Sequence, residues 1–378
     1  MRFAVMTLLV FAAGAWARKS IPAMFGAGLV TLALEMFVFS WVGVGWTVWG
    51  LILVPGLLSC WVAAKHRIGN LATQQPSNLL ILIPIAIFAI TVLSATITSG
   101  DFLFFWGTKG QRFAQAGMID VAFLRDPAHA VMHPEYPPLV PLYYAWTMLG
   151  STELNWFLAM ASAILFLAFA AWETRSALFA SLFALLFIRN DVAGNAEPAL
   201  IFFEVVALAA LLAKNDIIAA IALCGVALTK IEGAVFVVIV ILLLGRRWKV
   251  ALPPLLTLAA WWIFAKTNGL FGASDPRYAF SFAYIWPSVK QLAQQMSFGL
   301  WYLPWIAIAA WWRTDNPVCP EDPGQARLPV LHLAAALAFL AFMVLTYARP
   351  EAHMEWSAQR VLMTPLVLFF FSAITRNS

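Results

Sequence analysis

Runs of apolar residues long enough to cross a lipid bilayer recur along almost the whole chain. One of them, LLILIPIAIFAITVL at 79–93, contains no charged side chain. A membrane-spanning helix needs about 20 mostly apolar residues, because the hydrocarbon core is about 30 Å thick. A membrane β-barrel would instead show alternating segments of about ten residues. The runs therefore predict an all-α, polytopic membrane protein.

The scarcity of charge supports this class. Only 11% of the 378 residues are charged and 63% are hydrophobic, whereas a soluble domain carries about 25% charged residues. In such a chain the net charge of +5 reports topology before anything else. We therefore expect a lipid bilayer as a partner and no nucleic acid. The three cysteines lack the spacing of a metal site or of a disulfide framework.

We predict about 13 transmembrane helices from these runs. The run 138–150 is too short and too rich in proline to span, so we expect a helix at the membrane interface there. Residues 1–17 are interpreted as a first membrane helix, with a cleaved signal peptide as the alternative. The predicted spans are 3–17, 22–41, 45–64, 79–98, 153–172, 175–190, 197–213, 215–230, 233–245, 250–266, 295–312, 328–347 and 359–375.

Arginine and lysine residues fall in every second connection between the predicted helices. By the positive-inside rule this side faces the cytoplasm, which puts the C-terminus in the cytoplasm and residue 1 outside. We expect a multi-pass protein of the bacterial inner (plasma) membrane. The groups that define the cytoplasmic side are Arg18/Lys19, Lys65/Arg67, Arg175, Lys214, Arg246/Arg247/Lys249, Arg313/Arg327 and Arg376.

The opposite side holds the long connection 99–152, which we expect to be a large extracytoplasmic loop containing juxtamembrane helices. It opens with DFLFFWGTKGQR at 101–112, which combines Asp101 with Lys109 and Arg112. A carboxylate edged by aromatic groups at a membrane surface is partly desolvated, which suits a general base. The alternative is a plain solvated helix end. Because insertion does not require these charges, we expect a functional site on this side.

The same loop contains HPEYPPLVP at 133–141. Residues before proline favour an extended backbone, and consecutive prolines are stiff. Such a segment can hold His133, Glu135 and Tyr136 in place without regular structure. The alternative is a rigid loop that leads into the interfacial helix.

Further acids lie in RNDVAGNAEPALIFFE at 189–204, where Asp191 and Glu197 bracket a Gly-Asn turn. Glu197 near a helix N-terminus also complements the helix dipole, which is a purely structural explanation. Glu204 lies about two turns into the predicted membrane helix, and an intramembrane carboxylate points to function. For Glu35, midway along another span, hydrogen bonding between helices or a protonated state is the simpler interpretation.

Two cations on this side are candidates for binding phosphate. Lys230, in TKIEG at 229–233, is either a point-charge phosphate partner or a loop lysine paired with Glu232. Arg360 begins the last helix, where a cation opposes the dipole, so its placement suggests a bound phosphate. The chain has no Walker loop, CxxC pair, HExxH or GxSxG motif, and soluble-type nucleotide binding has no support.

In this order the motifs resemble the GT-C superfamily of polytopic glycosyltransferases, which includes protein O-mannosyltransferases, lipid A aminoarabinose transferases and many bacterial lipopolysaccharide enzymes. Four helices are predicted before the loop where the family commonly has one, and Glu197 stands where Asp is usual. The matching elements are Asp101, Trp106 and Lys109 at the loop start, His133–Leu139 at its end, Glu197–Leu200, Thr229, Lys230 and Gly233, and more loosely Arg360–Pro365.

The resemblance implies transmembrane helices at 1–78 that extend a GT-C-like catalytic module at 79–378. It implies an inverting glycosyltransferase that moves a sugar from a polyprenyl-phosphate donor to a hydroxyl of a glycan, lipid or protein acceptor, on the extracytoplasmic side. Asp101 would be the general base, and the carboxylates permit a divalent cation, Mg²⁺ or Mn²⁺, without requiring one. Acceptor or metal orientation would fall to Asp191, Glu197, His133 and Glu135, phosphate binding to Lys230, Arg360, Lys109 and Arg112, and sugar stacking to Trp106, Tyr136 and Tyr143.

Two other classes of protein stay open at this point. A membrane transporter or flippase for a polar or lipid-linked solute could use Glu35 and Glu204 along a proton or solute path. The sequence shows no clear internal repeat of the kind that transporters often have. A non-catalytic membrane scaffold would leave the charges of the outer loops unexplained.

Overall fold

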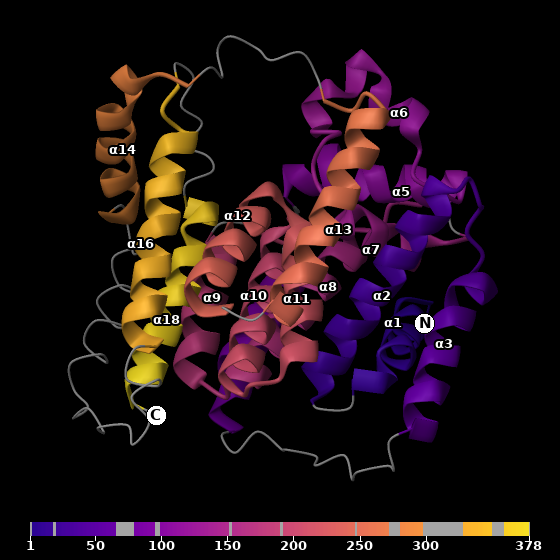
Figure 1. Cartoon of the computed structure of the whole chain (residues 1–378), viewed down its shortest axis with the longest axis horizontal. Coiled ribbons are helices and arrows are strands. Elements are labelled where there is room, and N and C mark those ends of the chain that lie inside the picture. Colours follow the sequence, from indigo (N-terminus) through magenta and orange to yellow (C-terminus); the bar gives the residue numbers. More distant parts are fainter. Residues whose placement is uncertain are drawn as a thin grey trace. The chain divides into compact units, whose positions relative to one another are not determined.

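The computed structural model is helical throughout its described part, in which no residue belongs to a β-strand (Figure 1). Three of the described helices are long and apolar enough to cross a membrane: α2 (Ile21–Trp41), α8 (Trp156–Thr174) and α13 (Trp248–Thr267). Eight shorter apolar helices accompany them. The structure describes residues 2–17, 20–65, 79–94, 99–150, 153–189, 192–245, 248–271, 280–297, 328–349 and 359–377.

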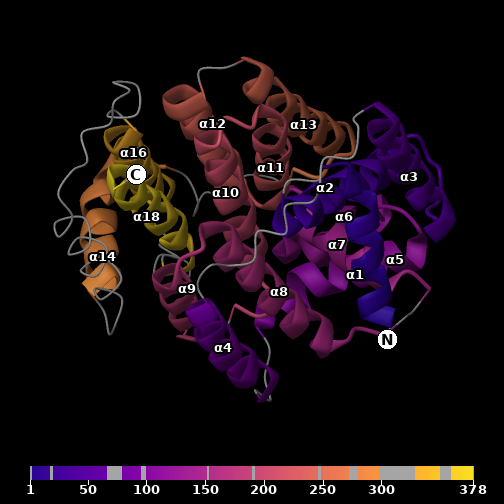
Figure 2. The same cartoon turned by 90° about the horizontal axis from the view of Figure 1, so that it is seen from below.

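The chain divides into two compact units, and the first contains every helix up to the start of α12 together with the end of α13. The helices of unit 1 follow the predicted apolar runs closely. Figure 2 shows α4 alongside α8 and α9 within this unit. Besides α2, α8 and α13 they are α1 (Arg2–Ala13), α3 (Val48–Lys65), α4 (Leu82–Ser94), α9 (Ala177–Arg189), α10 (Glu197–Leu212) and α11 (Asp216–Thr229), with short turns η1 (Ala15–Ala17) and η2 (Leu79–Ile81). Of α12 (Ile231–Val240), the residues up to 234 belong to unit 1 and those from 235 on to unit 2.

Helix α2 packs against α1, α3, α7 (Leu139–Met148), α8, α10 and α11. It begins with a side-chain cap, because the Ser20 hydroxyl accepts from the Ala23 N–H, and Pro22 follows in the first turn. Such a cap satisfies one of the free N–H groups of the helix end. Helix α2 crosses α1 at Gly28, and the two helices are so close there that a Cβ on Gly28 would lie 1.9 Å from the Val10 carbonyl oxygen. A larger side chain at position 28 therefore cannot fit between the two helices.

The long loop 99–150 folds into a set of short helices, as predicted. It contains the π-helix η3 (Phe102–Trp106), α5 (Gly107–Ala116), α6 (Val121–Arg125), the 3-10 helix η4 (Pro127–Met132) and α7 (Leu139–Met148). The predicted interfacial helix at 138–150 is α7, and all ten of its residues are buried. Burial follows from contact with α5, where Gly110 lies against α7 so closely that a Cβ would be 2.6 Å from Cβ of Tyr144.

Several of the connections between helices meet at one end of unit 1. Loop 99–150 contacts the turns 42–47 and 192–196 and residue 268 at the end of α13, and Lys230 before α12 contacts Glu197 directly after the turn 192–196. Trp46 N donates to the Gly117 carbonyl and Ser99 N to the Ala193 carbonyl, while Trp146 Nε1 of α7 donates to the Met6 carbonyl of α1 and Trp261 Nε1 of α13 to the Glu135 carbonyl. We call this region the loop end of unit 1.

Unit 2 comprises 235–251 and 273–378 and is described by itself. Within it, α16 packs on both α18 and α14, and Ser288 of α14 donates a hydrogen bond of 2.7 Å to the Tyr347 carbonyl. Much of the predicted span 295–312 lies outside the described residues. The described elements that lie wholly in unit 2 are η5 (Ile241–Gly245), η7 (Phe282–Tyr284), α14 (Ile285–Ser297), α16 (Leu328–Thr346) and α18 (Met363–Asn377).

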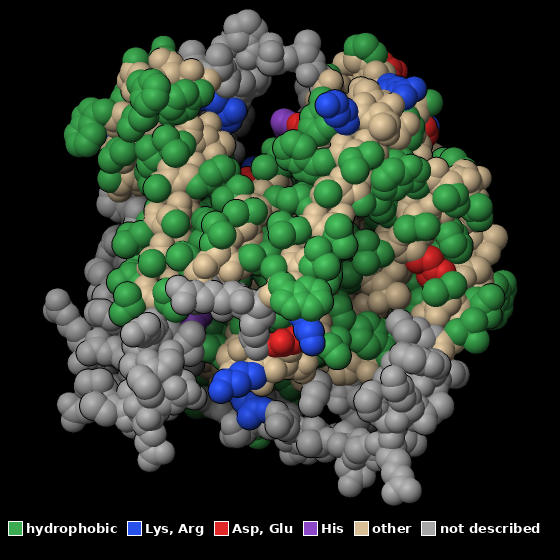
Figure 3. Space-filling view, in the orientation of Figure 1, with side chains coloured by type: hydrophobic (Ala, Val, Ile, Leu, Met, Phe, Trp, Pro, Cys, Tyr) green, Lys and Arg blue, Asp and Glu red, His purple; other side chains and the backbone are tan. Residues whose placement is uncertain are grey.

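Large apolar side chains are exposed along α3, α4 and α13. Trp49, Leu53 and Leu57 of α3 are 84%, 61% and 61% exposed. Figure 3 shows hydrophobic side chains covering the middle of the helices on the visible face, with Lys, Arg, Asp and Glu gathered mainly toward the helix ends. Monomeric soluble proteins rarely expose contiguous apolar surface on this scale, so the surface suits a lipid environment.

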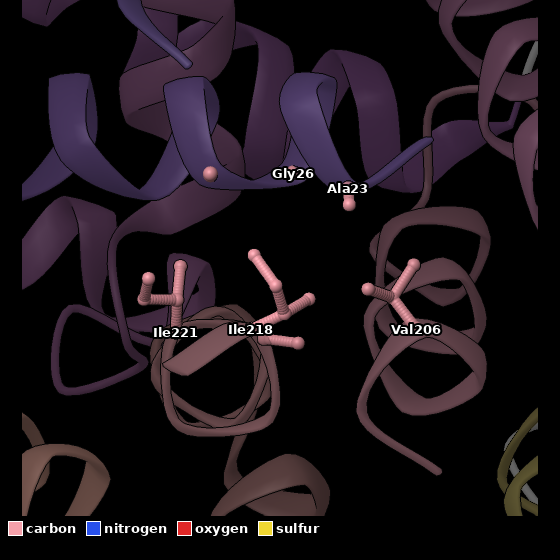
Figure 4. A pocket seen from close by; sticks show the side chains of 7 residues that line it. Ala23, Gly26, Val206, Ile218 and Ile221 are labelled. Carbon is pink, nitrogen blue, oxygen red and sulfur yellow. The ribbon is translucent and has the colours of Figure 1, made fainter. Parts of the chain in front are cut away.

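A shallow hollow with no room for a water molecule lies where α2 packs against α10 and α11. Its lining is apolar, and Ala23 and Gly26 of α2 face Ile218 and Ile221 of α11 across it (Figure 4). Val206 of α10 also lines the hollow, and it lies more than two turns beyond Glu197, the first residue of that helix. The hollow is thus separate from the charged groups of the loop end. Its lining residues are Ala23, Gly26, Ala27, Val206, Ile218, Ile221 and Ala222.

The turn 192–196 depends on a glycine for both its conformation and its contacts. Gly194 has φ +95°, and a Cβ there would lie 2.5 Å from Cβ of Phe102. Gly194→Ala should therefore destabilise the protein by about 1–3 kcal/mol, measured by thermal unfolding in detergent. Gly56→Ala is the control, because nothing lies within 4 Å of its added Cβ. Equal thermal stability of the Gly194→Ala variant and the wild type would contradict the close approach.

Candidate functional site

The site begins where the segment preceding η3 meets the turn preceding α10. Ser99 N donates to the Ala193 carbonyl, and the Ser99 hydroxyl donates to Oδ1 of Asn195. The same hydroxyl accepts a hydrogen bond of 3.1 Å from the Asp101 N–H. Asp101 is therefore held, half-buried, beside the turn that leads into α10. Segments almost 100 residues apart in the sequence meet here, and Asp101 lies at their junction.

An ion cluster lies directly after that turn. Lys230, between α11 and α12, contacts Oε1 of Glu197 at 3.0 Å and Oε1 of Glu232 at 3.2 Å. Glu197 is only 2% exposed and Lys230 9%. Burying a charge without partners is costly, so the lysine is stabilised by the two carboxylates and each carboxylate by the lysine. Helices α10, α11 and α12 are tied together by this cluster at the loop end.

The ion cluster bears on two predictions, the phosphate-binding role of Lys230 and the binding of a divalent cation by the carboxylates. We predicted Lys230 as a phosphate partner, but its amine lies between two carboxylates and its charge is already compensated. The same amine occupies the place that a divalent cation would take between Glu197 and Glu232. Across the described residues, no group of three or more His, Cys, Asp and Glu side chains is arranged to hold a metal ion.

Lys109 lies on α5, deep in the packing of the loop. Its side chain donates a hydrogen bond of 2.8 Å to the His133 carbonyl and lies 5.3 Å from the centre of the Trp106 ring. Only 2% of the residue is exposed. Burial lowers the pKa of Lys109 to about 7, and the Glu135 carboxylate opposes that shift. Lys109 therefore acts on the backbone of the His133 segment and is too buried to meet a substrate directly.

His133 has an unusual backbone and a well-defined ring environment. Its φ of 51° is left-handed, which is uncommon for a residue other than glycine. Its ring stacks on Tyr136 at 4.5 Å and lies nearly parallel to Phe105 at 5.8 Å. Its Nδ1 lies 3.3 Å from Oε1 of Glu135. The structure thus brings His133, Glu135 and Tyr136 together, and it leaves 49% of the His133 side chain exposed.

The three aromatic residues predicted to stack on sugars differ in their surroundings. Tyr136 is partly exposed, and Trp106 is buried beside it with ring centres 6.1 Å apart. Tyr143 is 2% exposed inside α7, and its hydroxyl accepts a hydrogen bond from Ser162. Because both its ring and its hydroxyl are engaged in packing, we leave Tyr143 out of the site. Tyr136 is the member whose ring is accessible.

The remaining predicted residues fall in different places. Arg112 is exposed, with its guanidinium 5.3 Å from the Phe123 ring. Arg360 belongs to unit 2 and is described only within it. Asp191 lies outside the described residues. Glu204 is fully buried in α10 and Glu35 is 9% exposed in α2, so both are enclosed carboxylates.

Several residues of the site were missed at the level of sequence. Ser99 and Asn195 join the two segments, Phe105 lies against His133, and Trp261 of α13 donates to the Glu135 carbonyl at 3.0 Å. The Gly-Asn pair before Pro198 does indicate a turn, and that signal alone points to Asn195. No local pattern could pair Asn195 with Ser99 or Trp261 with Glu135, because those contacts depend on the fold.

Comparisons with known proteins add no family to this geometry. No family model, no curated protein and no solved structure matches the chain.

The contribution of the Glu197–Lys230–Glu232 cluster to stability can be measured by replacing its lysine. Lys230→Met removes the cation but keeps a similar side-chain length, leaving the buried carboxylate of Glu197 and the partly buried one of Glu232 without it. Breaking a buried ion pair costs about 3–5 kcal/mol, so thermal unfolding should show a loss of that size. Lys249→Met, at an exposed position, is the control and should change stability by less than about 0.5 kcal/mol. A Lys230→Met protein as stable as the control variant would refute the cluster.

The buried amine of Lys109 should make the free energy of unfolding depend on pH. Its pKa is about 7 in the folded protein and 10.5 in its ordinary state, so the unfolded chain binds more protons between these values. The free energy of unfolding should therefore rise with pH across this window, by at most about 1.4 kcal/mol per pH unit for one proton. Lys109→Met should lose this contribution. The measurement is the melting temperature of both proteins from pH 7 to 10, and parallel curves would contradict the prediction.

Proposed function

We propose that the protein is a membrane-embedded glycosyltransferase that uses a polyprenyl-phosphate sugar donor and an acceptor hydroxyl. The observation that supports it most is the position of Asp101. A carboxylate that starts the long loop lies at the junction of that loop with the turn before the Glu197–Lys230–Glu232 cluster. The apolar, exposed helix surfaces supply the lipid-facing walls that a polyprenyl chain requires.

The proposed reaction has a simple division of labour. Asp101 accepts the proton of the acceptor hydroxyl as the new bond to the sugar forms. The phosphate of the carrier leaves with the electron pair of the broken bond, which gives inversion at the sugar carbon. Tyr136 offers a ring face to a sugar, and Glu197 is held rigidly by Lys230 at the start of α10. Such fixed groups lower the barrier because they need no reorganisation during the reaction.

The proposal includes a topology. About 13 transmembrane helices place the loop end outside the cytoplasm and the C-terminus inside, in a bacterial inner membrane. Arg2 fits this arrangement, because a Cβ added to Gly150 would lie 3.3 Å from its guanidinium, so Arg2 lies beside the end of the loop. An arginine there does not report a cytoplasmic N-terminus. Residues 1–78 form the N-terminal extension of the proposed module.

The test uses purified protein in proteoliposomes with polyprenyl-phosphate-linked pentoses and hexoses and a cell-envelope glycolipid extract as acceptor. Asp101→Asn should fold normally and reduce release of polyprenyl phosphate, measured by mass spectrometry, by at least about 100-fold. Asp126→Asn, an exposed acid of the same loop, is the matched control and should retain turnover. Full turnover by Asp101→Asn would remove Asp101 from the mechanism.

A transporter or flippase remains the second candidate because of Glu35. Both of its carboxylate oxygens are buried in α2 and make no hydrogen bond to any described residue. A carboxylate in this state inside a membrane helix suits proton binding. Uptake of a lipid-linked or polar solute that stops in Glu35→Gln, without any sugar transfer by the wild type, would favour this class.

A further inference from the structure

The cations that could hold a donor phosphate are mostly engaged elsewhere. The Lys230 amine contacts two carboxylates, and the buried Lys109 amine donates to the His133 carbonyl. Arg125 donates to the Asn268 carbonyl. A phosphate leaving group accepts several charge-assisted hydrogen bonds, so a donor of the loop end besides the exposed Arg112 adds to its stabilisation.

His133 is the loop-end residue whose geometry supplies such a donor. Glu135 faces its Nδ1, and no hydrogen bond to Nε2 is made by any described residue. Half of the side chain is exposed, so the ring is accessible although two aromatic rings lie against it. A carboxylate facing Nδ1 orients the ring, and a ring that carries a proton on each nitrogen donates from Nε2 as well. The ring is thus oriented, and Nε2 is its available donor.

The backbone of His133 is held in place for this purpose. The left-handed conformation of His133 ends the 3-10 helix η4, because His133 is its C-terminal cap and its N–H donates to the Ala130 carbonyl. Here the His133 carbonyl accepts from Lys109 Nζ at 2.8 Å and from the Tyr136 N–H at 3.1 Å. Lys109 on α5 and Glu135 on the same segment are the charged groups placed against His133, while α13 contributes Trp261, which holds the Glu135 carbonyl.

We propose that His133 Nε2 binds the phosphate of a lipid-linked phosphate ester, and that Lys109 is the positioning residue that holds His133. The proposal deepens the glycosyltransferase function and rests on it for the identity of the ester. The acceptor oxygen bonds to the sugar carbon while the bond from that carbon to the phosphate oxygen breaks. The electron pair goes to the phosphate oxygen and the acceptor proton goes to Asp101. His133 contributes a hydrogen bond to the phosphate and transfers no proton.

Phosphate binding is measurable without any transfer. The full-length protein in nanodiscs is titrated with a short-chain polyprenyl phosphate, with the matching polyprenol, and with inorganic phosphate, and dissociation constants are obtained by ³¹P NMR or by calorimetry. His133→Ala should bind the polyprenyl phosphate at least about 10-fold more weakly, because a hydrogen bond to a charged group is lost. Binding of the polyprenol should not change. His129→Ala, another histidine of the same loop, is the matched control and should bind normally.

Lys109 is tested by a readout that a loss of stability would not produce. The chain has only five histidines, so the imidazole ¹H–¹⁵N signal of His133 can be assigned by its disappearance in His133→Gln. Lys109→Met should shift this signal and weaken polyprenyl phosphate binding, while polyprenol binding stays the same. An unshifted signal with wild-type affinity would remove Lys109 from the site.

The outcomes separate the two proposals. Wild-type affinity of His133→Ala for the polyprenyl phosphate, or an equal loss for the polyprenol, overturns the phosphate role of His133. Tight inorganic phosphate binding with the same dependence on His133 supports the phosphate chemistry and assigns it to a water-soluble source. If His133-dependent binding is present but no sugar is transferred, the glycosyltransferase proposal fails and this one stands.

Discussion

The buried amine of Lys230 is the constraint on which the loop end depends. A lysine enclosed among apolar helices needs compensating charge, and Glu197 and Glu232 supply it at 3.0 and 3.2 Å. Because the two acids begin α10 and α12, the pairing fixes where both helices start. The turn before α10 is thereby fixed as well, and Gly194 and Asn195 of that turn meet Phe102 and Ser99. The position of Asp101 is a consequence of this series of contacts.

A second buried amine, that of Lys109, holds the segment around His133 at the loop end. Lys109 is a buried residue of α5. The residue after it, Gly110, allows α5 to contact α7 closely. Its hydrogen bond to the His133 carbonyl orders the proline-rich segment, which has no regular structure of its own. In both cases a lysine that sequence reasoning assigns to phosphate turns out to have an internal partner. The imidazole of His133 and the guanidinium of Arg112 are exposed groups of the same loop.

The helices were predictable because hydrophobicity is a local property. The runs assigned to 22–41 and 197–213 correspond to α2 and α10 within a residue or two, and the loop 99–152 was expected to contain short helices. The burial of Lys109 and Tyr143 and the link between Ser99 and Asn195 were not predictable. Each depends on contacts between distant segments, and hydropathy assigns a lysine to the surface by default.

The central claim is that the loop end carries out chemistry on a lipid-linked phosphate ester and does not move it across the membrane. Purified wild-type protein, reconstituted in one orientation, can be given a polyprenyl-phosphate sugar labelled in both the sugar and the phosphate. The account predicts that the sugar label passes to the acceptor and that free polyprenyl phosphate accumulates on the side of the loop. Intact donor appearing in the opposite leaflet, with both labels still joined and no free polyprenyl phosphate, would contradict it.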